Sequence, residues 1–129
     1  GKSLVNNIVA ACQDKKAKNI VIVDMTGLIC TICQYFVICE GNTPTQVSAI
    51  SEEIVDSLKK KKERPLSVDG LRESRWVGID YGTVIVHVFL PELREFYNIE
   101  NLWADAKLES IPDTDSQHSL IICCYTDSI

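Results

Sequence analysis

The sequence predicts an α/β fold, a single domain in which helices cover a mixed β-sheet of about five strands. Three observations support this fold class. Two short runs rich in β-branched residues occupy residues 19–24 and 34–39, amphipathic helical patterns precede and follow them, and residues 75–90 have the pattern of a β-hairpin. With 129 residues, 46% of them hydrophobic and 24% charged, the chain can bury one core of its own.

The first predicted elements are a helix and two strands. Ser3 is a candidate cap for a helix that runs to about Lys16, with one apolar stripe made by Leu4, Val5, Ile8, Val9 and Cys12. Residues 19–24 show no alternation between apolar and polar side chains, as in a strand that is buried on both faces, and residues 34–39 form a second strand that ends before Gly41-Asn42. The helix is therefore expected to cover a sheet that contains both strands.

The second predicted helix has the clearest start in the sequence. Thr43 is the expected cap, Pro44 takes the first helical position, and Gln46 follows Thr43 at capping-box spacing. Its inner stripe is Val47, Ile50, Ile54 and Leu58. The run of lysines at residues 59–62 closes the helix, and such a run is more often a solvated helix end than a phosphate contact.

The remaining elements are an edge strand, the hairpin and a C-terminal helix. Residues 65–68 suit an edge strand because of Pro65, Pro91 can open a helix through Tyr97, and residues 101–106 are expected to continue helically. After Pro112 the pattern degrades, and the apolar residues 119–125 suit only a weak strand or a tail. We therefore divide the chain into a domain at residues 1–111 and a C-terminal tail at 112–129 that is weakly ordered or adds a late strand.

The hairpin carries an unusual mixture of side chains on one face. If Tyr81-Gly82 is the two-residue loop, Asp80 lies opposite Thr83 and Trp76 lies opposite His87. A tryptophan and a carboxylate on one face suit a binding surface. The alternative is that a helix covers this face, with Trp76 in ordinary packing and Asp80 satisfying backbone donors in the turn.

Composition and charge narrow the classes of function. No stretch approaches the roughly 20 apolar residues of a membrane span, and the first residues do not resemble a signal peptide, so we expect a soluble cytoplasmic protein with no membrane partner. The six cysteines are expected to stay reduced. A net charge of −5 argues against broad nucleic-acid binding and favours a basic protein partner.

The residues give no positive evidence for catalysis, a metal or a cofactor. Cys30 and Cys33 have CxxC spacing but no second pair of ligands, and they precede a strand rather than a helix. Asp80 has no partner carboxylate at an alternate position, and Asp113 and Asp115 lie in the irregular tail. No glycine-rich phosphate loop is present, and His87 has no nucleophile at an elbow beside it.

Several segments taken together closely resemble the Iojap, or ribosomal silencing factor, family. They are residues 34–38, 46–47, 76–82, 86–89, 94–97 and 102–106, in family order and at family spacing. The resemblance covers about Leu4 to Ala106. It implies a nucleotidyltransferase-like fold without the catalytic carboxylates, and therefore a protein that is not an enzyme.

The resemblance also implies a function and a partner. Family members bind the fourteenth protein of the large ribosomal subunit, block joining of the small subunit and repress translation when nutrients are short. A minor contact with ribosomal RNA and a homodimer are further partners that it leaves open. The partner-binding residues that carry over are Trp76, Asp80, Tyr81, Gly82, His87, Arg94, Glu95, Tyr97 and Trp103.

This chain departs from the family pattern at three places, and two other functions remain alternatives. Gln34 replaces an aspartate, Pro44-Thr45 replace a serine and an arginine, and Thr83 replaces an aspartate, so each change removes a charge. One alternative is a nucleotidyltransferase-like enzyme, which magnesium-dependent binding of a nucleoside triphosphate would favour. The other is a homodimeric interaction module, which light scattering would detect.

Overall fold

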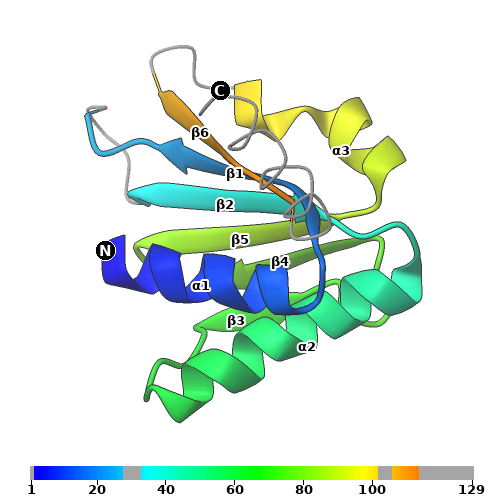
Figure 1. Cartoon of the computed structure of the whole chain (residues 1–129), viewed down its shortest axis with the longest axis horizontal. Helices are drawn as coiled ribbons and strands as arrows, with labels where there is room; N and C mark the ends of the chain where they lie inside the picture. Colours follow the sequence, from blue (N-terminus) through cyan, green and yellow to red (C-terminus); the bar gives the residue numbers. More distant parts are fainter. Residues whose placement is uncertain (1, 28–32, 102–105, 114–129) are drawn as a thin grey trace, which may run out of the picture.

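A computed structural model of the chain describes residues 2–27, 33–101 and 106–113, which form a six-stranded sheet with helices on both faces (Figure 1). Its elements are α1 (Lys2–Asp14), β1 (Lys18–Asp24), β2 (Tyr35–Glu40), α2 (Pro44–Lys60), β3 (Ser67–Asp69), β4 (Trp76–Asp80), β5 (Val84–Phe89), α3 (Pro91–Tyr97), the 3₁₀ turn η1 (Ile99–Asn101) and β6 (Lys107–Ile111). The α/β class is confirmed. Among the described residues, no helix has the length and apolarity that crossing a membrane requires.

The sheet is mixed, as the sequence predicts. The strands lie in the order β3-β4-β5-β2-β1-β6, with β2 and β5 parallel and every other pair antiparallel. The parallel pair lies at the centre and needs a crossover, which α2 provides on its way from β2 to β3. Two antiparallel halves are thereby joined along one central pair.

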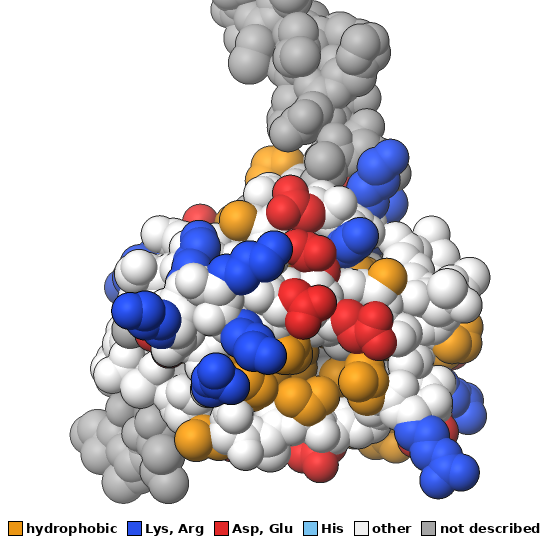
Figure 2. Space-filling model, turned by 90° about the horizontal axis from the view of Figure 1, so that it is seen from below, with side chains coloured by type: hydrophobic (Ala, Val, Ile, Leu, Met, Phe, Trp, Pro, Cys, Tyr) orange, Lys and Arg blue, Asp and Glu red, His pale blue; other side chains and the backbone are white. Residues whose placement is uncertain are grey.

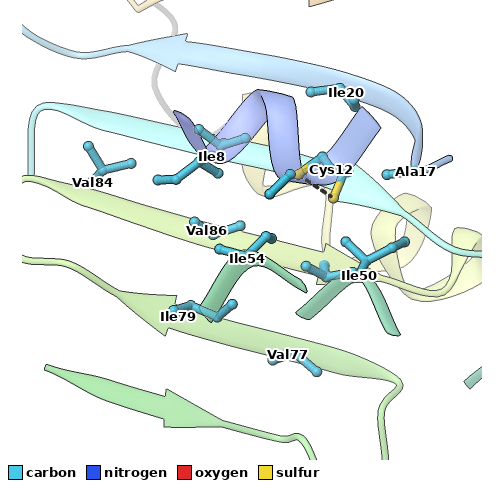
Figure 3. Close-up of a cluster of buried hydrophobic side chains, with 14 of the residues drawn as sticks. Ile8, Cys12, Ala17, Ile20, Ile50, Ile54, Val77, Ile79, Val84 and Val86 are labelled. Atoms are coloured by element: carbon cyan, nitrogen blue, oxygen red, sulfur yellow. Dashed lines mark hydrogen bonds between the residues drawn. The ribbon is translucent and has the colours of Figure 1, made fainter. Parts of the chain in front are cut away.

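Helices α1 and α2 lie next to each other across one face of the sheet and enclose the larger core (Figures 1 and 3). The predicted stripes of both helices, apart from the half-buried Val9, are buried there against Val77, Ile79, Val84 and Val86 of the hairpin. Cys12 and Cys39 are fully buried free thiols whose sulfur atoms lie 3.8 Å apart between α1 and β2.

The predicted start of α2 is confirmed. The Thr43 side chain accepts a hydrogen bond from the Gln46 amide at 3.1 Å, and the Gln46 side chain accepts one from the Asn42 amide at 2.8 Å. The predicted cap of the first helix is wrong, because α1 already includes Lys2 and Ser3 lies inside it.

Both long helices end in the same way. A lysine in the left-handed region follows each helix, Lys16 at φ 58° and Lys62 at φ 66°. The next amide then donates back across the turn, from Ala17 to the Cys12 carbonyl at 3.0 Å and from Glu63 to the Leu58 carbonyl at 2.9 Å. This is the Schellman motif, in which glycine is the favoured residue at the left-handed position.

The predicted hairpin register is wrong by two residues, although the predicted faces are correct. Trp76 lies opposite Phe89 rather than His87, and Asp80 lies opposite Ile85 rather than Thr83. Gly82 and Thr83 form the loop, with Gly82 at φ 86°, and the Tyr81 amide donates to the Val84 carbonyl at 2.8 Å. A shift of two residues leaves every side chain on its own face of the sheet.

Strand β6 was not predicted from the sequence, whose pattern indicated about five strands and a helical segment over residues 101–106. Of that segment, Asn101 belongs to η1, Ala106 directly precedes β6, and residues 102–105 lie outside the described part, as does the predicted late strand at 119–125. The β6 residues are mostly exposed and two of them are charged, so they lack the apolar run that marked the other strands.

Candidate functional site

The second face of the sheet carries an aromatic cluster beneath a short helix. Val21, Val23, Phe36, Ile38 and Phe89 form a smaller core on this face, and Leu93 of α3 and Ile99 of η1 pack against it. The sequence left open whether a helix covers the hairpin here. The structure places α3 on this face, because Pro91 opens the helix directly after β5.

Trp76 lies at the centre of the cluster and is half-buried. Its ring stacks on Phe89 with centroids 4.9 Å apart and contacts Tyr97 of α3 at 4.7 Å. Its indole N–H donates to His87 Nδ1 at 3.1 Å. We define the aromatic face as Trp76, His87 and Phe89 together with Phe96 and Tyr97 of α3. Trp76 therefore packs as the alternative interpretation expected while keeping part of its ring accessible.

His87 is held neutral within this cluster. Burial lowers its pKa from the usual 6.5 to about 4. Because Nδ1 accepts the bond from Trp76, the neutral ring carries its proton on Nε2, which has no hydrogen-bond partner in the described part of the chain. The ring also lies edge-on to Phe36, with centroids 4.9 Å apart. His87 therefore acts in packing and orients Trp76.

Arg94 is buried, and its side chain bonds groups on the sheet and on η1. Its guanidinium group bonds Glu100 at 2.8 Å and 3.1 Å, Glu40 at 3.0 Å and the Asn19 carbonyl. The pKa of Arg94 is raised by the two carboxylates, although burial alone would lower it. These bonds join α3, η1, β2 and the start of β1, so Arg94 positions the helix that carries the exposed aromatic residues.

The outer surface of α3 presents two aromatic rings beside acidic side chains. Phe96 is 78% exposed and Tyr97 is 45% exposed, and their rings meet edge to face at 5.0 Å. Glu92 and Glu95 are exposed on the same helix, and neither takes part in an ion pair within the described residues. Glu95 and Tyr97 were predicted from the sequence as contact residues, whereas Phe96 was not, although it lies in the same run from Arg94 to Tyr97.

Asp80, at the end of β4 next to the hairpin loop, lies about 13 Å from Trp76 at the usual rise per residue. Asp80 accepts the Gly82 amide at 2.7 Å, so its carboxylate serves the turn. Tyr81 packs against the larger core, and burial and the charge of Glu63 raise its pKa to about 12. Its hydroxyl has no partner within the described residues. The structure therefore separates Asp80, Tyr81 and Gly82 from the aromatic face.

Other residues singled out in the sequence lie on the surface or outside the described part. Trp103 and Cys30 lie outside it, and Cys33 is half-buried with its thiol donating to the Tyr35 carbonyl at 2.9 Å. The residues that depart from the family pattern are all exposed: Gln34, Pro44, Thr45 and Thr83. Within the described residues, no group of three or more His, Cys, Asp and Glu side chains is arranged to hold a metal ion.

Comparisons with known proteins agree with the fold and with the residue pattern. Residues 2–120 match the family model described as ribosomal silencing factor during starvation. The chain is 43% identical over 110 residues to the ribosomal silencing factor RsfS of Bacillus subtilis, covering 85% of this chain and 92% of that protein.

Two further relatives extend the match. The chain is 30% identical over 116 residues to the chloroplastic protein Iojap of Zea mays, covering 89% of this chain and half of that protein. A crystal structure from Bacillus halodurans superposes with a TM-score of 0.72 at 34% identity and covers 87% of this chain and 99% of that one. On the family match and these identities, the chain belongs to the ribosomal silencing factor family, which includes RsfS and Iojap.

Proposed function

We propose that this protein represses translation by binding the large ribosomal subunit through its fourteenth protein and blocking the small subunit from joining. Membership of the silencing factor family supports the ribosome as the target. The observation that carries the docking site is the exposed pair Phe96 and Tyr97, set on a helix that Arg94 fixes to the sheet. The protein then acts as a steric block in the compartment that holds the ribosomes, the cytoplasm, and breaks no bond.

The chemistry of the aromatic face suits a basic protein. Aromatic side chains supply most of the binding energy at many interfaces, and Phe96 and Tyr97 are prepositioned by the contact of the Tyr97 ring with Trp76. The exposed carboxylates of Glu92 and Glu95 flank them and complement cationic side chains. Trp76 and His87 support this surface from below, while Arg94 acts by positioning.

The first test is sedimentation of the protein with separated ribosomal subunits. Phe96→Ala removes an exposed ring and is expected to lower affinity for the large subunit about tenfold or more, as at a binding hot spot. The unfolding midpoint should change little, because 78% of the Phe96 surface is already exposed. The same gradients report the fraction of joined ribosomes, which wild type should lower and Phe96→Ala should restore.

Leu66→Ala is the matched control for this test. Leu66 is 75% exposed but precedes the edge strand β3, away from α3. This variant should bind and block as wild type does. Equal binding by wild type and Phe96→Ala would rule out the aromatic face as the docking site, and failure of wild type to sediment with the large subunit would rule out the proposed function.

A homodimer is the alternative occupant of the aromatic face. A second copy would bury the same two rings, and its flanking acids would face like charges, which weakens the pairing. Light scattering of wild type and Phe96→Ala separates the cases. A dimer that Phe96→Ala dissociates, without any change in subunit binding, would assign the face to self-association.

A further inference from the structure

A basic cluster lies at the end of α2, on a part of the molecule that the proposed docking site does not use. We define the α2 basic cluster as Lys59, Lys60, Lys61, Lys62 and Arg64. All five side chains are exposed. The chain has 13 Lys and Arg against 18 Asp and Glu, so five of its cations lie within six residues of an otherwise acidic protein.

The positive charge of this cluster is offset only in part by Glu63, which lies within the same run of residues 59–64. Within the described residues, no carboxylate forms an ion pair with any of the five side chains. Lys61 donates to the neutral side chain of Asn7 at 3.0 Å, which leaves its charge in place. Figure 2 shows the face on which α2 and β3 lie, with Lys and Arg side chains gathered on the side where α2 ends.

The helix dipole does not account for the whole cluster. Only Lys59 and Lys60 lie in the last turn of α2, where cations meet the negative end of the helix. Lys61, Lys62 and Arg64 follow the helix. Lys62 takes the left-handed position at φ 66°, where glycine would be the favoured residue. A charged side chain therefore occupies a position at which the backbone conformation alone would favour glycine.

We propose that the α2 basic cluster contacts RNA phosphates on the ribosome while α3 docks on ribosomal protein. This inference rests on the proposed function, because the cluster meets ribosomal RNA only when the protein is bound to the ribosome. Figure 1 draws the end of α2 and the helix α3 at opposite corners of the molecule, so the two surfaces can be occupied at the same time. The cluster then supplies a salt-sensitive part of the affinity that the aromatic face does not provide.

The composition of the cluster favours a phosphate backbone over a protein or a membrane. Four of its five cations are lysines, which act as point charges on phosphates, and it contains no aromatic residue to anchor a protein. The cluster also contains no apolar side chain that could insert into a membrane surface. A chain that is already docked on a ribosome needs only the local charge of the cluster to reach RNA.

The two Schellman lysines provide a matched pair of variants. Lys62→Gly and Lys16→Gly each remove one exposed lysine from a left-handed position at the end of a long helix, at φ 66° and φ 58°. Glycine suits this position, so both variants should keep or raise the melting temperature. The two lysines lie at opposite ends of the helical layer, because the Lys16 carbonyl is bonded by Gln46 at the start of α2.

The experiment is a titration of large subunits with each variant at a series of KCl concentrations and fixed Mg²⁺. Lys62→Gly should weaken binding and lower the slope of log K against log salt by about one, whereas Lys16→Gly should leave the slope unchanged. Lys59→Gln, Lys60→Gln and Lys62→Gln combined should lower the slope by about three. Phe96→Ala should weaken binding with no change of slope.

A second probe separates this inference from the proposed function. A 20-base-pair RNA duplex alone should bind wild type weakly at low salt and should not bind the triple variant. If wild type does not bind subunits, the proposed function fails and the duplex alone decides the inference. Identical salt slopes for wild type and the triple variant on subunits, or binding to phosphatidylserine vesicles but not to the duplex, would overturn the RNA contact.

Discussion

Arg94 shows how a residue with the pattern of a contact residue can act from inside the fold. The sequence placed it beside Glu95 and Tyr97, which suggested one shared surface. In the structure its guanidinium group lies between Glu40 and Glu100, on elements that are far apart along the chain. No local sequence pattern predicts these ion pairs, because the carboxylates of Glu40 and Glu100 come close to Arg94 only when β2, α3 and η1 pack together.

Replacing Arg94 should therefore destabilise the protein. Arg94→Met leaves the carboxylates of Glu40 and Glu100 close together and unpaired, which is expected to lower the free energy of unfolding by about 3–5 kcal/mol. Urea denaturation measures this loss. Arg94→Lys keeps the charge but not the planar fork, so it should fall between wild type and Arg94→Met. A loss below about 1 kcal/mol for Arg94→Met would contradict the positioning role.

His87 should make stability depend on pH in a defined window. Its pKa is about 4 in the folded protein and 6.5 when unperturbed, so between these values the unfolded chain binds the extra proton. This proton uptake does not affect stability above pH 6.5. As pH falls toward 4 it lowers the free energy of unfolding, by about 3 kcal/mol in total.

The measurement is the free energy of unfolding of wild type and His87→Gln between pH 7.5 and 4. The carboxylates change the free energy of unfolding with pH to the same extent in both proteins, so the difference between the two curves measures the effect of His87 protonation. Wild type should lose more stability than the variant on acidification. Parallel curves would show that His87 is not shielded from solvent as the structure indicates.

Individual elements were predictable from sequence wherever their chemistry is local. The Thr43 cap and the Pro91 helix start depend on residues within one turn, and both were correct. The hairpin was found but its register was not, because Tyr81-Gly82 and Gly82-Thr83 both place glycine in a two-residue loop. Strand β6 was missed because it gains its place from pairing with β1, not from its own apolar residues.

The loop between β3 and β4 should be the least tolerant of a methyl group. Gly70 has φ 87°, and a Cβ built there would lie 2.2 Å from the Trp76 carbonyl oxygen, so Gly70→Ala must displace the backbone at the start of β4. We expect a loss of more than about 1 kcal/mol and altered Trp76 fluorescence.

Gly78→Ala is the control for this strand. Gly78 lies between Trp76 and Asp80 on the same side of β4, and a Cβ there meets nothing within 4 Å. This variant should fold with near wild-type stability. Comparable damage from both substitutions would show that the crowding at Gly70 is not the cause.

At the scale of the whole molecule, the order of strands in the sheet determines which strands are most stable against local unfolding. The central strands β2 and β5 are paired on both sides and buried between two layers, whereas β3 and β6 lie at the edges with mostly exposed side chains. Hydrogen exchange should therefore be slowest in β2 and β5 and fastest in β3 and β6. Uniform protection across the sheet would contradict this order.

The pairing of β6 with β1 also has a consequence for synthesis. Residues 20–24 pair with residues 107–111. During synthesis β1 is therefore made first, but its outer edge stays unpaired until β6, almost the last described segment, has been made. Until then a nascent chain exposes a β-branched edge that can join strands of other chains. Polar β6 therefore protects the newly made protein from aggregation, and a chain cut short before residue 107 would lose that protection.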